Sequence, residues 1–418
     1  MKKILKGILS IVLSAVFLAG CVFLVSFFPE KDFKKEKALS EKTGESSVIS
    51  ESPDRSKSSN SGFMKAVWVP FMSLDMGKND RSRTAAEKKL NAIFEKVRKA
   101  GADTAFLHVR PFCDALYKSK IFPSSHLLSG VQGKDVDYDF LETAIKLAKK
   151  QGIHIHAWIN PLRVSYSKTP SSFADSNPCM KWKNDSDSSN DNYTFTSSGN
   201  IYLNPAYPEV RRLIVDGVRE IVKNYDVDGV VIDDYFYPPD DMKADQREYE
   251  LYSSKAGETY LSQNNWRKQN INTLLCSIYS AVHYERSECL FGISPQCNME
   301  NDEKLAADIK SWSVITGYCD YISPQTYVSE YHPLLPFGKC VDEWRKLVRN
   351  ENVKLYISLS LYKEGTDADD GTWLKKKDNI SSQIAYLKKA GADGYVLYSC
   401  EDLDKVIRND EKTVPAGN

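Results

Sequence analysis

The sequence has no excess of charge of either sign, because its 56 Lys and Arg residues are matched by 56 Asp and Glu residues. It also lacks a basic block interleaved with aromatic residues, the usual footprint of a nucleic-acid-binding surface. Its nine cysteines show neither CxxC pairs nor the Cys/His spacing of zinc sites. We therefore expect no nucleic-acid partner, no metal and no cofactor. The cysteines are typical of small buried apolar residues, with one or two disulfides possible outside a cell.

A long apolar run stands at the N-terminus, where Lys2, Lys3 and Lys6 precede residues 8–28. The run is as long as the roughly 20 residues that a helix needs to cross a bilayer, and the lysines favour a cytoplasmic N-terminus. The motif LAGC, which ends in Cys21, instead resembles the lipobox at which bacterial lipoproteins are cleaved and lipidated. Residues 1–29 are thus predicted to be an uncleaved anchor or a lipoprotein signal. Either alternative places the rest of the chain on the extracytoplasmic face of the cell membrane.

Residues 30–62 are dominated by Lys, Glu, Ser and Asp and contain few large apolar residues. Such a stretch cannot bury enough apolar surface to offset the entropy cost of ordering it. We interpret it as a flexible polar linker, with an interaction tail as the alternative. The remaining segment, residues 63–410, is long for one domain unless it folds as an α/β barrel, which runs to about 250 residues and beyond. We expect the protein to be monomeric.

The segment 63–410 alternates short apolar runs with amphipathic helical patterns. Near-continuously apolar strands are typical of a parallel sheet that is covered on both faces. A doubly wound sheet is the alternative, but no GxGxxG motif follows the first run. We predict an α/β protein with a (β/α)₈ TIM barrel, whose strands lie at residues 66–70, 104–109, 153–158, 229–232, 289–293, 321–325, 355–359 and 394–398. The predicted helices lie at residues 85–99, 138–151, 208–224, 266–284, 341–349 and 380–390.

Polar and aromatic residues gather at the carboxyl ends of the predicted strands, where such barrels carry their active sites. Carboxylates, amides, guanidinium groups and aromatic rings together suit a sugar, which offers hydroxyls and apolar ring faces. The candidate substrate-binding residues are Arg110, Trp158, Asn160, Arg163, Tyr235, Tyr237, Gln325 and Tyr327. Structural roles are the alternatives for three of them. The two arginines could pair with Asp114 or Asp233 and hold the rim together, and the tryptophan could belong to the barrel wall.

Glycoside cleavage needs two carboxyls, one protonated and one ionised. Asp233 is the leading catalytic candidate, because a buried strand leads directly to it. Asp234 is expected to point elsewhere, since successive strand residues alternate faces; convergence of the two would raise one pKa. Asp114 is the leading candidate for the second catalytic carboxyl, and the next candidates are Glu364, Glu330 and Glu401. The strand histidines, which lack metal spacing, are assigned to the core or the rim: His108, His154 and His156.

Six blocks of the chain resemble, in order, the glycosyl-hydrolase-like 10 family: HVRPFCDALYKS, AWINPLRV, YLNPAYPEVR, VDGVVIDDYFYP, ISPQ and YISPQTY. That family includes bacterial envelope proteins that act on peptidoglycan glycan strands. The resemblance implies a TIM barrel, a glycosidase-type activity and an envelope location. The spacing DGxxxD from Asp228 to Asp233 is also similar to the fourth-strand motif of α-amylase-type barrels, which implies that Asp233 is the nucleophile. The fifth-strand Glu of those enzymes is replaced by Ser294-Pro295-Gln296, and the paired glutamates of family 10 xylanases are not evident, so the second carboxyl stays open.

These features together predict a membrane-tethered extracytoplasmic glycoside hydrolase that acts on cell-wall glycan, with peptidoglycan as the leading substrate. A catalytically inactive barrel that binds wall glycan and scaffolds envelope proteins is the alternative. A third hypothesis is a secreted enzyme that acts on dietary or plant polysaccharide. The sequence favours this hypothesis less, because it shows no appended carbohydrate-binding module. The polar excursion at residues 164–200 has the length of a functional lid without regular structure and is expected to overhang the site.

Overall fold

The computed structural model describes residues 62–238 and 241–411, which belong to one compact unit, Asn60–Asn418. The predicted anchor, the alternative lipidation site at Cys21 and nearly all of the predicted linker lie outside the described residues. Within residues 62–238 and 241–411, no helix is both long enough and apolar enough to span a bilayer.

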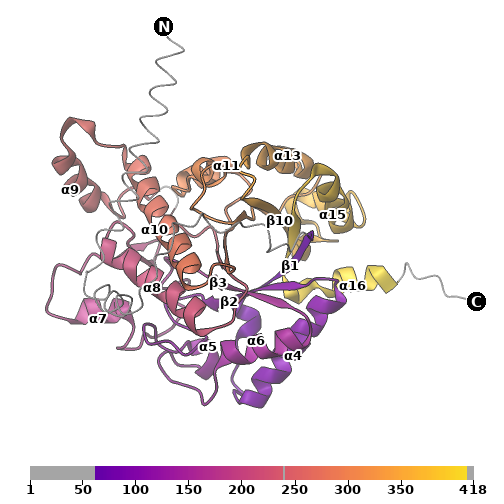
Figure 1. Cartoon of the computed structure of the whole chain (residues 1–418), viewed down its shortest axis with the longest axis horizontal. Helices are drawn as coiled ribbons and strands as arrows, with labels where there is room; N and C mark the ends of the chain where they lie inside the picture. Colours follow the sequence, from indigo (N-terminus) through magenta and orange to yellow (C-terminus); the bar gives the residue numbers. More distant parts are fainter. Residues whose placement is uncertain (1–61, 239–240, 412–418) are drawn as a thin grey trace, which may run out of the picture. The chain divides into compact units, whose positions relative to one another are not determined.

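A closed parallel barrel forms the centre of this unit, as predicted (Figure 1). Neighbouring strands pair in parallel around the barrel, and the last strand pairs with the first, Met64 lying opposite Gly394. The barrel strands are β1 (Met64–Val69), β2 (Thr104–Arg110), β3 (His154–Ile159), β6 (Gly229–Ile232), β7 (Leu290–Ile293), β8 (Tyr321–Ile322), β9 (Gln325–Thr326), β10 (Lys354–Ser360) and β11 (Gly394–Tyr398).

The sixth barrel strand is split into two pieces, although the sequence predicted one continuous strand at 321–325. Both β8 and β9 pair in parallel with β10, so they occupy one position in the barrel. Between them lie Ser323 and Pro324. Proline has no N–H to donate to a strand ladder, which explains the interruption at this point.

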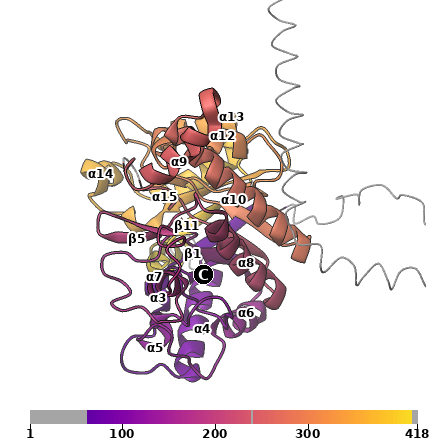
Figure 2. The same ribbon diagram turned by 90° about the vertical axis from the view of Figure 1, so that its left-hand side faces the viewer.

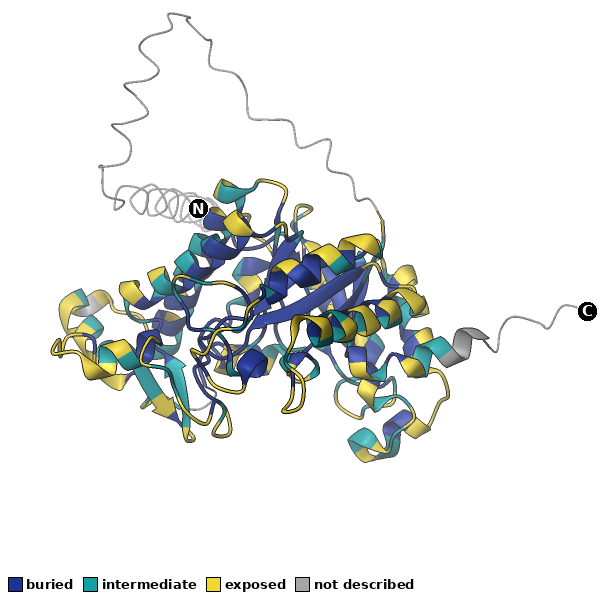
Figure 3. Ribbon diagram, turned by 90° about the horizontal axis from the view of Figure 1, so that it is seen from below, coloured by how far each residue is buried: buried dark blue, intermediate teal, exposed yellow. Residues whose placement is uncertain are grey.

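Amphipathic helices surround the barrel, because each buries one apolar stripe against the outer face of the strands. The six predicted helices are α4 (Arg83–Lys99), α6 (Phe140–Lys150), α8 (Pro208–Asn224), α10 (Gln263–Glu285), α13 (Phe337–Leu347) and α15 (Asn379–Ala390). Helices α8 and α10 lie side by side in both views of the ribbon (Figures 1 and 2). The barrel strands are mostly buried, and the helices around them expose their outward faces (Figure 3).

Two apolar clusters form the core, one on each face of the barrel wall. The larger cluster lies between strands and helices. The smaller one fills the inside of the barrel with aromatic rings, including Trp68, Phe106, Trp158 and Tyr321. Gly292 makes room for this filling, because a Cβ atom there would lie 2.0 Å from the ring of Tyr321. The barrel is therefore a packed core whose interior rings lead up to its mouth.

The polar excursion at 164–200 is more regular than the sequence predicted. It contains the helix α7 (Pro178–Asn184) and the strand β4 (Thr194–Ser197), which forms an antiparallel hairpin with β5 (Asn200–Leu203). A second addition, the exposed helix α9 (Gln246–Ala256), follows β6. The shorter helices are α3 (Phe71–Leu74), α5 (His126–Ser129), α11 (Met299–Lys304), α12 (Ile309–Trp312) and α14 (Ala368–Gly371), and α16 (Asp404–Glu411) ends the described chain.

Candidate active site

A cavity of about 420 Å³ lies at the carboxyl ends of the barrel strands. This is the rim at which active sites of such barrels are found. Residues from or just after β1, β2, β3, β6, β9, β10 and β11 contribute to its wall. The lining residues are Trp68, Pro70, Phe71, Met72, His108, Trp158, Arg163, Tyr166, Asp233, Asp234, Tyr235, Gln325, Tyr327, Tyr362 and Tyr398.

Asp233 lines this cavity directly after β6, and its side chain is buried. The indole Nε1 of Trp158 donates a hydrogen bond to its Oδ2 at 2.9 Å. The amide Nδ2 of Asn160 donates to Oδ1 and Oδ2 at 3.1 and 3.2 Å. Burial, opposed by the charge of Arg163 and aided by the neighbouring Asp234, raises the pKa of Asp233 to about 7. The carboxyl therefore titrates near neutral pH, as a group that exchanges protons during catalysis requires.

Asp234 lines the same cavity, although the alternation of strand residues predicted that it would point elsewhere. The prediction fails because β6 ends at Ile232, so the alternating strand geometry does not extend to either aspartate. The amide groups of Gln325 and Gln296 donate to the two carboxylate oxygens of Asp234 at 2.8 and 2.9 Å. Burial raises the pKa of Asp234, and the two glutamine hydrogen bonds oppose this by favouring the ionised form.

Arg163 brings a positive charge to the cavity wall, and this charge acts to lower the pKa of Asp233. Its Nε donates to the carbonyl oxygen of Pro111 at 3.0 Å. Its guanidinium carbon lies 4.8 Å from the centre of the Tyr235 ring and 5.0 Å from that of Phe112. The backbone N–H of Arg163 also donates to Oδ1 of Asn160 at 2.9 Å. The loop after β3 thus orients both the amide that holds Asp233 and the nearby cation.

Arg110 does not reach the cavity. A register shift between His108 and Arg110 in the pairing of β2 with β3 turns Arg110 away from the face that His108 occupies. Its guanidinium lies 4.6 Å from the ring centre of Phe122, and a Cβ atom on Gly217 of α8 would lie 2.5 Å from its Nη1. Arg110 therefore packs among the helices behind the barrel wall.

Four other predicted site residues also lie outside the cavity lining: Asp114, Glu364, Tyr237 and Asn160, of which Asn160 nevertheless bonds to Asp233. Asp114 is buried, and its Oδ2 accepts hydrogen bonds from His126 and Gln132 at 3.2 and 3.1 Å. Glu364 accepts the backbone N–H groups of Asn379 and Ile380, the first residues of α15, at 3.2 and 2.8 Å. It satisfies donors that a helix N-terminus leaves unpaired.

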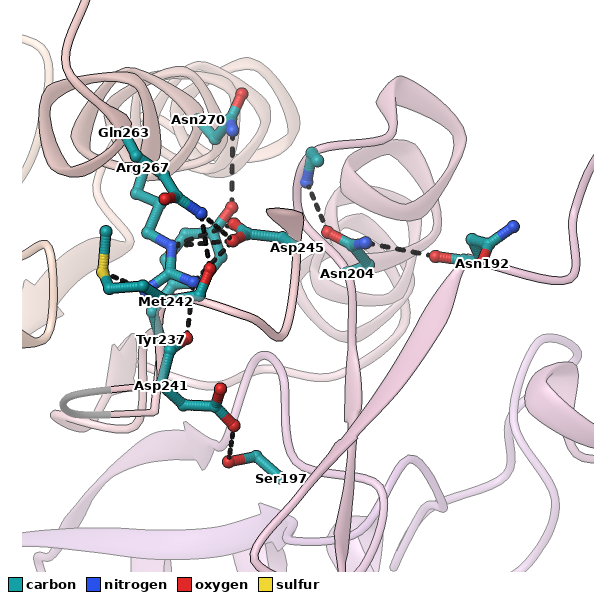
Figure 4. Close-up of polar contacts among 11 residues, drawn as sticks. Asn192, Ser197, Asn204, Tyr237, Asp241, Met242, Asp245, Gln263, Arg267 and Asn270 are labelled. Atoms are coloured by element: carbon teal, nitrogen blue, oxygen red, sulfur yellow. Dashed lines mark hydrogen bonds and ion pairs between the residues drawn. The ribbon is translucent and has the colours of Figure 1, made fainter. Parts of the chain in front are cut away.

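Tyr237 is buried beside α10, where the guanidinium of Arg267 lies 4.7 Å from its ring centre (Figure 4). Asn270 donates to its hydroxyl at 3.3 Å. Arg267 forms a buried ion pair with Asp245. This cluster holds the segment after β6 against α10.

Glu401 and Glu330, the remaining candidates for the second catalytic carboxyl, also bond to groups outside the cavity. Oε1 of Glu401 accepts the hydroxyl of Ser73 at 2.7 Å. Oε2 of Glu330 accepts a hydrogen bond from the backbone N–H of Gly338 at 3.2 Å. Glu330 lines a separate cavity of about 270 Å³ beside α15. Of the predicted catalytic carboxylates, the structure brings only Asp233 and Asp234 together.

Aromatic residues that were not predicted as site residues from the sequence make up much of the remaining wall. Trp68 belongs to the interior cluster, and its ring meets that of Trp158 at 4.7 Å. Tyr362 and Tyr398 lie at the ends of the seventh and eighth barrel strands, a position that the sequence does mark. Tyr166, which is half exposed, comes from the excursion after β3, and nothing in the sequence marked it.

His108 is buried with its ring stacked on Trp158, the centroids being 3.6 Å apart. Burial lowers its pKa well below the usual value, so the imidazole is neutral. Within the described part of the chain, no group of three or more His, Cys, Asp and Glu residues is arranged to hold a metal ion.

A parallel barrel that presents two carboxylates, amides and aromatic rings at its mouth defines a protein of the glycosyl-hydrolase-like class. The chain matches the family described as Glycosyl hydrolase-like 10 over residues 63–375, and it belongs to that family. It is 30% identical over 344 residues to glycosyl hydrolase DigH of Escherichia coli O6:H1 (strain CFT073), covering 77% of this chain and 75% of that protein. It is 29% identical over 364 residues to glycosyl hydrolase YngK of Bacillus subtilis (strain 168), covering 82% and 69%.

Solved structures show the same fold at low sequence identity. The glycoside hydrolase domain of PgaB (BpsB) from Bordetella bronchiseptica aligns with a TM-score of 0.55 and 12% identity, covering 84% of this chain and 97% of that one. Alpha-L-fucosidase isoenzyme 2 from Paenibacillus thiaminolyticus aligns with a TM-score of 0.51 and 12% identity, covering 84% and 49%.

Proposed function

We propose that the protein hydrolyses glycosidic bonds in a cell-wall glycan, peptidoglycan being the substrate that fits best, and that Asp233 and Asp234 are its catalytic carboxyls. The observation that carries this proposal is their convergence on one cavity at the barrel mouth. They are the two carboxylates among the described lining residues, and they have different surroundings.

Glycoside cleavage needs one protonated and one ionised carboxyl, and the different environments of Asp233 and Asp234 assign one role to each. Asp233, with a pKa of about 7, is protonated in a large fraction of molecules at neutral pH and serves as the general acid. Asp234 is less deeply buried and accepts two glutamine N–H groups, which favour its charged form. It supplies the negative charge that stabilises the oxocarbenium-like transition state.

The rest of the cavity suits a sugar. Aromatic rings such as Tyr235 and Tyr362 are each 41% exposed and can stack on the apolar faces of pyranose rings. Arg163 offers guanidinium N–H groups to hydroxyls or carbonyls, whereas the amide of Gln325 donates to Asp234 and orients that carboxylate. Half-exposed Tyr166 extends this surface beyond the mouth, as recognition of a polymer requires.

The wall-glycan substrate and the envelope location are supported by the sequence. The apolar run at 8–28 and the polar stretch at 30–62 suit a barrel tethered outside the cytoplasm beside an insoluble polymer. Intact-mass measurement of the membrane-extracted protein separates the two anchors. A diacylated species beginning at Cys21 identifies a lipoprotein, and a chain that retains residues 1–28 identifies a transmembrane anchor.

The activity is tested by reducing-end release from purified, peptide-stripped wall glycan. We expect release by the wild type and a loss of about 100- to 10 000-fold in kcat for Asp233→Asn, as for removal of a general acid. Asp228→Asn is the matched control, because Asp228 precedes the same strand at the other end of the barrel, where it contacts His154. Glycan binding without release would contradict the proposal and favour the binding-only barrel.

A further inference from the structure

The two cavity carboxylates belong to consecutive residues, and this adjacency limits what they can do. Consecutive Cα atoms are about 3.8 Å apart, so Asp233 and Asp234 enter the cavity from one side, the carboxyl end of β6. In an ordinary glycosidase the two carboxyls flank the scissile bond, about 5–5.5 Å apart for retention and about 6.5–9.5 Å apart for inversion. A second carboxyl on the far side of the sugar would have to come from another strand.

The wall opposite β6 has no carboxylate among the described lining residues. The strand order places β11 across the barrel from β6, with β1 next to it. These strands and the residues that follow them contribute Trp68, Pro70, Phe71, Met72 and Tyr398 to the lining. Glu401 follows β11 but is exposed, bonded to Ser73 and outside the lining. The described enzyme surface thus lacks a nucleophile or base on that face of the sugar.

Tyr327 supplies a hydrogen-bond donor beside the aspartate pair. Burial, then the neighbouring Tyr398 and Asp234, raise the pKa of its hydroxyl well above the usual value, so it keeps its proton. Its ring centre lies 5.6 Å from that of Tyr398 and 6.3 Å from that of Tyr362. This tyrosine cluster places aromatic faces and protonated hydroxyl groups in the same cavity as the two carboxyls, a combination that fits an acetamido group: N–H, carbonyl and methyl.

We propose that the cleaved bond belongs to a 2-acetamido sugar, and that the sugar's own acetamido oxygen replaces the missing enzyme nucleophile. This inference rests on the proposed function and adds its reaction path. Substrate assistance of this kind is a recognised exception to the two-carboxylate scheme. It needs both enzyme carboxyls on one side, because C1 and C2 of the sugar are neighbouring atoms and so are the groups attached to them.

In the first step the acetamido carbonyl oxygen forms a bond to C1 while the bond from C1 to the glycosidic oxygen breaks. Asp233 gives its proton to the leaving oxygen. Asp234 accepts the hydrogen bond of the acetamido N–H, and the Tyr327 hydroxyl orients the carbonyl. In the second step water adds to C1 of the cyclic oxazolinium, passes a proton to Asp233 and restores the acetamido group. The net reaction is hydrolysis with retention at C1.

The test uses one polymer with different groups on its nitrogen. Peptide-stripped wall glycan is chemically de-N-acetylated, and portions are re-acylated with acetyl or trifluoroacetyl groups. We expect the re-acetylated polymer to be cleaved, and the trifluoroacetyl polymer to be cleaved at least about tenfold more slowly, because fluorine weakens the carbonyl nucleophile. Equal rates on the two polymers would overturn substrate assistance while leaving the glycosidase function intact. No cleavage of the re-acetylated polymer would contradict the proposed function itself.

Variants of the full-length protein provide a second test. Asp234→Asn should lower kcat by about 100- to 10 000-fold, and Tyr327→Phe by about 10- to 100-fold, with KM changed less than kcat in both cases. A thiazoline analogue of the cyclic intermediate should inhibit the wild type competitively. Asp240, which lies outside the described residues, and Glu401 are changed to Asn and Gln in parallel. If either variant remains folded and loses as much turnover as Asp234→Asn, a separate enzyme nucleophile or base exists and the inference fails.

Discussion

Trp158 donates its indole N–H to Asp233 at 2.9 Å while its ring stacks on the neutral His108. The hydrogen bond stabilises the ionised carboxylate, and burial favours the protonated form. Together with the charges of Arg163 and Asp234, these two effects set the pKa of the proposed general acid near neutrality.

Trp158→Phe removes this donor and keeps most of the ring. We expect the pKa of Asp233 to rise, because its charged form loses a hydrogen bond, and the alkaline limb of kcat/KM to move to higher pH. A hydrogen bond to a charged group contributes about 1.5–3 kcal/mol. If Trp158 orients the Asp233 carboxyl, kcat/KM should therefore also fall by about 10- to 100-fold. Trp68→Phe is the matched control, since its Nε1 donates to Ser358 and not to a carboxylate. An unshifted limb in Trp158→Phe would show that the hydrogen bond does not tune Asp233.

Asp233→Asn should stabilise the protein at neutral and alkaline pH. The folded-state pKa of Asp233, about 7, lies above its ordinary value of 3.8. Between these values the folded state binds more protons than the unfolded state, so the wild type loses stability as pH rises. At about 1.4 kcal/mol per pKa unit, the difference reaches a few kcal/mol at most. Urea unfolding of both proteins at pH 4 and pH 8 measures it. If the variant is no more stable than the wild type at pH 8, the ionised carboxylate of Asp233 does not destabilise the folded protein.

Glu364→Ala should destabilise α15 without impairing chemistry. The carboxylate accepts two N–H groups at the start of that helix, and loss of such a cap costs about 1 kcal/mol. Thermal unfolding should show a lower midpoint, while kcat/KM per folded molecule stays within about twofold of the wild type. Loss of turnover in a fully folded Glu364→Ala protein would restore the sequence-based prediction of a catalytic role.

Cys113 and Cys179 should form a disulfide if the barrel is exported to an oxidising compartment. Their Sγ atoms lie 4.0 Å apart, and both side chains are buried. A hydrogen bond likewise joins the thiols of Cys297 and Cys340. Peptide mapping under non-reducing conditions, with free thiols blocked at lysis, should find these two cross-links, while Cys289 and Cys319 stay reduced. Recovery of all four paired cysteines as thiols from the native membrane would argue against an oxidising location.

The chain sequence by itself was enough to predict the barrel. Near-continuous apolar strands alternating with amphipathic helices admit few other arrangements, because each element must bury its apolar face. The carboxyl ends of those strands pointed to Asp233, Trp158, Asn160, Arg163, Gln325 and Tyr327, all of which lie in the cavity or bond to a carboxylate there.

Only the tertiary structure decided which remaining polar residues share that cavity. A register shift in β2 turns Arg110 outward, and the end of β6 at Ile232 lets Asp234 join Asp233. Glu364 and Tyr237 follow barrel strands, but the first caps a helix and the second packs beneath Arg267. Tyr166 reaches the mouth through the excursion after β3. The physical reason is that strand periodicity fixes where a side chain leaves the barrel, whereas bulges, strand ends and long-range partners fix where it points.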